Sequence, residues 1–163
     1  MSFQLARRSA VAIALATLAA AGAAGAQTAT QTVTFQVNAI NQISVAGSPS
    51  LTISTATAGS APVATSAAAT WAVTTNQTGA KITASLGAAM PAGLTLSANL
   101  AAPAGATSLG LVALGTTAVD VVTTITKVAQ GALALTYQLD ATPAAGVVAS
   151  SSRVVTYTIT GGT

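Results

Sequence analysis

The sequence has no histidine, no cysteine and only two acidic residues, which are Asp120 and Asp140. Most enzyme mechanisms require a group that titrates near neutral pH, a cluster of metal ligands, or a nucleophile beside a base. Calcium sites likewise need several clustered oxygen ligands, usually including carboxylates. Because the chain has almost none of these groups, we predict that it is not an enzyme and has no catalytic, cofactor-binding or metal-binding residues.

The few charged side chains offer two weaker catalytic alternatives. Asp120 and Asp140 fall on different predicted strands, so they could face each other across a cleft as the two carboxylates of a glycosidase do. No proton shuttle or oxyanion partner accompanies them, and Asp140 precedes a turn-forming segment. The second alternative is a Ser or Thr nucleophile that acts with Lys81 or Lys127 as its base. Both lysines are expected at outward or strand-end positions, where a lysine stays solvated and is not activated as a base. We interpret all four as structural or surface residues.

The absence of cysteine excludes disulfides and a lipid-anchored cysteine. Positive charge is also scarce, because the formal net charge is +3 and two of the five cationic side chains, Arg7 and Arg8, lie near the N-terminus. A nucleic-acid-binding protein needs clustered cations that neutralise several phosphates. Three scattered cations cannot form such a surface, so we predict no nucleic-acid partner.

Residues 1–26 have the pattern of an export signal. Arg7 and Arg8 form a basic start, residues 9–21 are almost uncharged and apolar, and Ala24-Gly25-Ala26 fits a small-residue cleavage site. The apolar stretch is shorter and richer in alanine than a membrane span. We predict cleavage after Ala26, a single domain over residues 27–163 with no transmembrane span, and a location in the periplasm or outside the cell.

What the chain has in abundance is period-two alternation in runs rich in Thr, Val, Ile and Leu. In residues 32–38, for example, Val33, Phe35 and Val37 fall on one face and Thr and Gln on the other, which predicts a half-buried strand. The same test predicts further strands at 42–46, 51–54, 70–75, 81–86, 94–100, 109–114, 119–126, 132–140 and 153–160.

Helices are disfavoured because Gly and Pro interrupt the chain often and β-branched residues lose rotamer freedom in a helix. We therefore predict an all-β fold, a single antiparallel immunoglobulin-like β-sandwich of about 8–10 short strands, with a small closed sheet as the alternative. Trp71, Tyr137 and Tyr157 each align with the apolar face of a predicted strand, so we expect them to anchor the core. The Asn76-Gln77-Thr78 segment is expected to form a turn.

Thr and Ser occupy most outward strand positions, where soluble proteins usually carry charge. Hydroxyl groups solvate a sheet surface but protect its edges weakly against pairing with another chain. Two explanations stay open at this point. The chain is either a secreted protein with a merely inert surface, or a protein whose edges pair in an assembly.

Residues 32–37 and 155–160 resemble the first and last strands of secreted bacterial fimbrial subunits. The Thr-, Ala-, Val- and Gly-rich, helix-poor composition between them is similar as well. The resemblance implies an immunoglobulin-like subunit whose groove is filled by an N-terminal strand from a neighbour. In this chain, Val33, Phe35 and Val37 would then be the candidate assembly strand.

Docking of those three side chains would gain roughly 5 to 8 kcal/mol of burial, while fixing the backbone costs on the order of 8 to 16 kcal/mol. Ladder hydrogen bonds must supply the rest, and the sequence allows the segment to form either a hairpin in its own chain or an extended arm. We predict an exported structural or self-associating surface protein, such as a fimbria-like or coat subunit, whose partners are copies of itself or other surface subunits. The alternative is a secreted binding module for a glycan or a cell-surface protein.

Overall fold

The structure is a computed structural model that describes residues 25–163, so all of the predicted export signal except Gly25 and Ala26 lies outside the described residues. The chain divides into two units, Met1–Gln36 and Val37–Thr163. Residues 25–36 belong to no helix or strand. Among the described residues, no helix is long and apolar enough to cross a bilayer.

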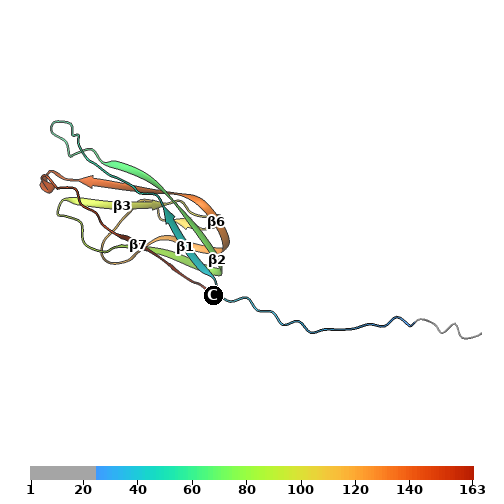
Figure 1. The fold of residues 1–163 in the computed structure, drawn as a ribbon. Helices are drawn as coiled ribbons and strands as arrows, with labels where there is room; N and C mark the ends of the chain where they lie inside the picture. Colours follow the sequence, from blue (N-terminus) through green and yellow to red (C-terminus); the bar gives the residue numbers. More distant parts are fainter. Residues whose placement is uncertain (1–24) are drawn as a thin grey trace, which may run out of the picture. The chain divides into compact units, whose positions relative to one another are not determined.

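The second unit is all-β, and its strands form one antiparallel sheet (Figure 1). A three-residue 3-10 turn, η1 (Pro143–Ala145), is the only helical element in the described part of the chain. The strands are β1 (Asn41–Ala46), β2 (Thr65–Leu86), β3 (Leu94–Leu100), β4 (Thr107–Ser108), β5 (Val112–Ala113), β6 (Val119–Ala141) and β7 (Val155–Thr160).

The two long strands β2 and β6 pair with each other from Thr65 opposite Leu139 to Ala84 opposite Val119. Along the other edge of β2, β1 pairs with its first half and β7 with its second half. Along the other edge of β6, β4 pairs with its first half and β3 with its second half. β5 pairs with the free edge of β3. Each long strand therefore belongs to two groups of neighbours.

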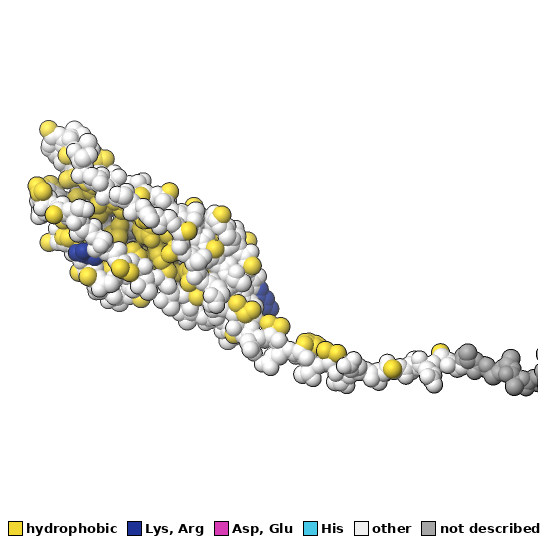
Figure 2. Space-filling model, in the orientation of Figure 1, with side chains coloured by type: hydrophobic (Ala, Val, Ile, Leu, Met, Phe, Trp, Pro, Cys, Tyr) yellow, Lys and Arg dark blue, Asp and Glu magenta, His cyan; other side chains and the backbone are white. Residues whose placement is uncertain are grey.

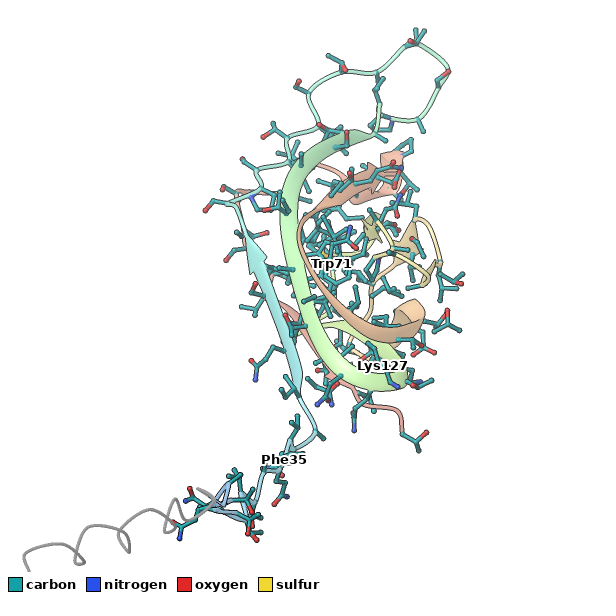
Figure 3. All side chains as sticks on the ribbon, turned by 90° about the vertical axis from the view of Figure 1, so that its right-hand side faces the viewer. Phe35, Trp71 and Lys127 are labelled. Carbon is teal, nitrogen blue, oxygen red and sulfur yellow. The ribbon has the colours of Figure 1, made fainter. Side chains whose placement is uncertain are left out.

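Irregular pairing between β2 and β6 marks the boundary between these groups. The register shifts several times between Trp71 and Thr83, and Thr124, Lys127 and Ala132 in β6 have positive φ angles. Extra residues at such bulges bend a strand and increase its twist. Figure 3 shows β2 and β6 as strongly curved ribbons, with Lys127 at the bend.

The bulges also change which side chains of β2 point inward. Trp71, Val73 and Thr75 are buried before the bend, whereas Ala80 and Ile82 are buried after it. Side chains alternate with period two, so an uneven number of steps between Thr75 and Ala80 transfers the inward face from odd to even positions. The buried side chains of both halves consequently join one hydrophobic cluster.

Several predicted elements differ from the structure. Residues 25–163 contain seven strands rather than 8–10. The segments predicted at 70–75 and 81–86 are continuous in β2, and those at 119–126 and 132–140 are continuous in β6. Residues 32–38 and 51–54 are in no strand, and only 112–113 of the predicted 109–114 strand pair. The turn expected at Asn76-Gln77-Thr78 is wrong, since these residues lie inside β2 at a bulge.

Candidate functional site

The most exposed large apolar side chains near the start of the described chain are those of the predicted assembly strand. Val33, Phe35 and Val37 have exposed fractions of 73%, 89% and 78%. They belong to a segment, Thr32–Asn38, that we call the arm and that forms no strand. The prediction of a half-buried strand in this segment is therefore wrong for the single chain.

The C-terminal tail, residues 161–163 after β7, explains why the pairing of β1 with β2 does not extend backward into the arm. The ladder between β1 and β2 starts with Asn41 opposite Thr75. Just beyond it, the Thr78 and Thr163 backbones exchange two hydrogen bonds, 2.9 Å and 3.1 Å long. A Cβ atom at Gly162 would collide with the Thr78 carbonyl, so only glycine lets the tail approach this closely. Because the tail occupies this edge of β2, the chain preceding β1 has no free ladder there.

A groove of about 940 Å³ lies at the end of the sheet that is remote from the bend. Figure 2 shows it as a hollow with hydrophobic side chains gathered on its floor. Leu96 and Tyr137 are nearly buried beneath it, and Arg153 is the only charged residue lining it in the described part of the chain. The half-buried apolar residues that line it are Leu51, Ile53, Met90, Leu94, Leu139 and Val155.

Two chain segments along the groove have unpaired backbones. Residues 48–54 follow β1 and residues 147–151 precede β7, and both segments contribute to the groove lining. Within the described structure, neither segment makes a backbone hydrogen bond to a strand. Unpaired N–H and C=O groups beside an apolar floor are the features that an added strand uses, since the ladder supplies affinity and alternate side chains fill pockets.

A pair of tyrosines lies at the base of this region. The Tyr157 hydroxyl donates a hydrogen bond of 3.0 Å to the Tyr137 hydroxyl. Burial first, and then the hydrogen bond and the charge interaction with Tyr137, raise the pKa of Tyr157 above its usual range. At the rim, Arg153 Nε donates to the Ala89 carbonyl at 2.9 Å. The groove is therefore uncharged except at its rim.

The expected core anchors are placed as follows. Trp71 is 1% exposed and lies on the concave side of β2 (Figure 3), Tyr137 is 7% exposed, and Tyr157 is half-buried against the core. The Trp71 Nε1 donor is buried and has no hydrogen-bond partner among the described residues. With its ring in the core, Trp71 offers no surface on which a sugar could stack.

The two carboxylates have separate partners. Asp120 forms an ion pair of 3.0 Å with Lys81, and both side chains are substantially exposed. Asp140 lies at the other end of β6 and accepts both of its 3.1 Å hydrogen bonds from Gln138. Within residues 25–163, no group of three His, Cys, Asp or Glu residues is placed to hold a metal ion.

The sequence matches no family model and no curated protein. The function is therefore inferred from the arm and the groove. Sequence reasoning identified the arm from its alternation but missed the groove, because Leu51, Ile53 and Leu139 read equally well as core residues. Their exposure at a shared surface depends on chain segments that are distant in sequence.

Proposed function

We propose that this protein is an exported, non-enzymatic structural subunit that associates with copies of itself at the cell surface or in the periplasm. In this proposal, the arm of one copy docks in the groove of another, as the resemblance to fimbrial subunits suggests. Val33, Phe35 and Val37 are the apolar anchors. The described part of the domain is an immunoglobulin-like sandwich folded from a single curved sheet.

The sandwich assignment is supported by how strands divide around the bend. β1, β3 and β5 flank the first half of β2 and the second half of β6, whereas β7 and β4 flank the remaining halves. The inward residues of both groups share one core cluster. Such a division is expected of two aligned sheets packed face to face, with two strands passing from one to the other.

The exposure of Val33, Phe35 and Val37 is the observation that carries the proposal. A soluble protein gains nothing by placing a valine, a phenylalanine and a valine in alternation on a solvated segment, because each buried side chain of this size is worth about 1.5–3 kcal/mol. The groove offers the complementary features, namely an apolar floor and unpaired backbone on both sides. The arm itself is uncharged, so no ion is buried when it docks.

The positions of the two surfaces favour an open chain of subunits. Ile40, at the root of the arm, is bonded to Asn76 at the bend, whereas the groove lies beside Tyr137 and Leu139 at the remote end of β6. The donating and accepting surfaces are thus different, and the root of the arm and the groove lie at opposite ends of the second unit. Such a heterologous contact builds a filament unless its rotation closes a ring.

The proposal is tested with two complementary variants of the exported protein, expressed with its N-terminal export segment. The first lacks Gln27–Val37 and has a groove but no arm. The second carries Ile53→Lys, which places a charge in the groove and leaves the arm intact. We expect wild-type protein to form filaments in electron micrographs and each variant alone to remain monomeric. Mixing the two variants should give a one-to-one dimer by light scattering, because only one arm and one groove remain functional.

The matched control is Thr57→Lys, which adds the same charge four residues later, at an exposed position that does not line the groove. It should assemble as wild type does. A wild-type protein that stays monomeric at high concentration, or a mixture that forms no dimer although both variants are folded by circular dichroism, would show that the proposal is wrong.

The same groove also supports the second candidate function, a binding module for an extended segment of a different surface protein. Its volume lies within the range of about 300–1,000 Å³ that ligand sites occupy. In that case the wild-type protein is monomeric, and Ile53→Lys weakens capture of the partner while deletion of Gln27–Val37 has no effect.

A further inference from the structure

The side chain of Asn76 binds the root of the arm at two backbone groups. Its Nδ2 donates a 2.8 Å hydrogen bond to the Asn38 carbonyl, and its Oδ1 accepts one of 2.8 Å from the Ile40 amide. The Asn76 backbone amide also donates to the Ile40 carbonyl at 3.3 Å. A primary amide has the same donor and acceptor as a peptide group, so Asn76 extends the β1 ladder beyond Asn41 by one further pair.

Neighbouring polar side chains hold this part of β2 in place. The Thr75 hydroxyl is nearly buried and donates to Asn41 Oδ1 at 2.7 Å, while Asn41 Nδ2 donates to Gln77 Oε1 at 2.6 Å. The Gln77 backbone amide in turn donates to Thr75 Oγ1 at 3.1 Å. These bonds join the start of β1 to the bulge of β2 on both sides of Asn76. We call the two side-chain bonds of Asn76 to Asn38 and Ile40 the clamp.

The groove of the same chain is beyond the reach of the arm. The strand from Asn76 to Ala67, which lies opposite Tyr137 at the groove, spans roughly 30 Å at about 3.3 Å per residue. From Ile40 back to Val33 the chain spans at most about 25 Å, and a reversal would use part of that length. Docking of the arm within its own chain must therefore take another form.

The accessible form is a hairpin on β1. Among the described strands, β1 pairs only with β2, so its second edge is open. A tight turn at residues 38–40 would place Thr34 opposite Ser44 and Phe35 opposite Ile43. Asn is a favoured turn residue, and an intramolecular strand has a millimolar effective concentration. Such a hairpin would bury the arm and remove it from any partner.

We infer that Asn76 prevents this hairpin: by binding the Asn38 carbonyl and the Ile40 amide at the same time, it keeps the arm available for the groove of a second copy. This inference rests on the proposed function. A turn at residues 38–40 breaks both bonds of the clamp, because the Asn38 carbonyl and the Ile40 amide can no longer face Asn76 together. The clamp therefore favours docking in trans, the choice that alternation in the sequence leaves open.

The chain has no cysteine, which allows a direct test with an introduced pair. Thr34→Cys and Ser44→Cys are both at exposed positions, and the hairpin would place them opposite each other on neighbouring strands, within disulfide distance. Oxidation at low protein concentration, followed by non-reducing electrophoresis, measures the initial rate of intramolecular crosslinking. Adding Asn76→Ala should raise this rate by about 5- to 150-fold, the range expected for the loss of two hydrogen bonds. The apparent association of subunits should fall in parallel.

Asn99→Ala is the matched control, because Asn99 is an amide in β3 whose side chain accepts one 3.3 Å bond from Ser108. It should leave the crosslinking rate unchanged. Asn76→Asp retains the acceptor for Ile40 but loses the donor to Asn38, so it should raise the rate even if Asn76→Ala folds poorly. An unchanged rate in folded Asn76→Asp overturns the inference. A wild-type protein that never associates contradicts the proposed function instead, and the crosslinking rate still reports on the clamp.

Discussion

Replacement of Phe35 by alanine separates the stability of the fold from the strength of association. Phe35 is 89% exposed in the single chain, so the substitution removes almost no native contact. The free energy of unfolding should change by less than about 0.5 kcal/mol, as for other surface positions. If the ring is buried in the groove of a neighbour, the association free energy should weaken by about 1.5–3 kcal/mol.

Each 1.4 kcal/mol corresponds to a factor of ten in affinity, so the expected loss is about 10- to 150-fold. The measurement is the Kd between the Ile53→Lys variant, which donates an arm, and the variant lacking Gln27–Val37, which offers a groove. Isothermal titration calorimetry with and without Phe35→Ala in the donor gives the ratio directly. Thermal unfolding of the same proteins measures stability.

Thr34→Ala is the control, because Thr34 is the neighbouring residue on the opposite face of the arm. It should change the Kd by less than about threefold, as expected for a surface substitution. An unchanged Kd for Phe35→Ala would refute the role of the ring in docking. A lowered unfolding temperature for Phe35→Ala would show that the ring packs within its own chain.

Three further predictions concern the domain itself. Trp71→Ala should lower the free energy of unfolding in urea by about 3–5 kcal/mol, because it leaves a large cavity in the core. Val45→Ala, opposite Trp71 in β1, is the control and should cost about 0.5 kcal/mol or less, since Val45 is 48% exposed. Gly162→Ala should destabilise the domain by about 1–3 kcal/mol, measured by thermal unfolding, because it breaks the two backbone hydrogen bonds between Thr163 and Thr78. Gly115→Ala is the control and should be neutral, since its added methyl group meets open space. Stability should fall as pH rises above about 10, because Tyr157 ionises near that pH when unfolded and its folded pKa is higher; Tyr157→Phe should flatten this decline in pH-dependent unfolding curves.

The alternation of apolar residues predicted the strand segments well where one face is buried throughout. It failed where the backbone is irregular, because a bulge transfers the inward face from odd to even positions without ending the strand. The residues from Asn76 to Gly79 have the composition of a turn, yet they lie within β2, which bends there without ending. Their amides serve β1 and the C-terminal tail instead of closing a turn.

The groove illustrates a second limit. Leu51 and Ile53 alternate with Thr and Ser like a strand, but the chain that would pair with them is missing from their own fold. Sequence alternation shows that a segment can present an apolar face, and it does not show whether another segment covers that face. The same ambiguity made the arm look half-buried, although its side chains are exposed.

By itself, the sequence determined the all-β class, the near-absence of ionisable groups and the apolar alternation of the arm, because these depend only on composition and local periodicity. The tertiary structure decided which alternating segments find partners. It placed the C-terminal tail on the edge of β2 that β1 would otherwise extend along, and it brought the Asn76 amide to the root of the arm. Both effects depend on contacts between residues far apart in the chain, which no local pattern encodes.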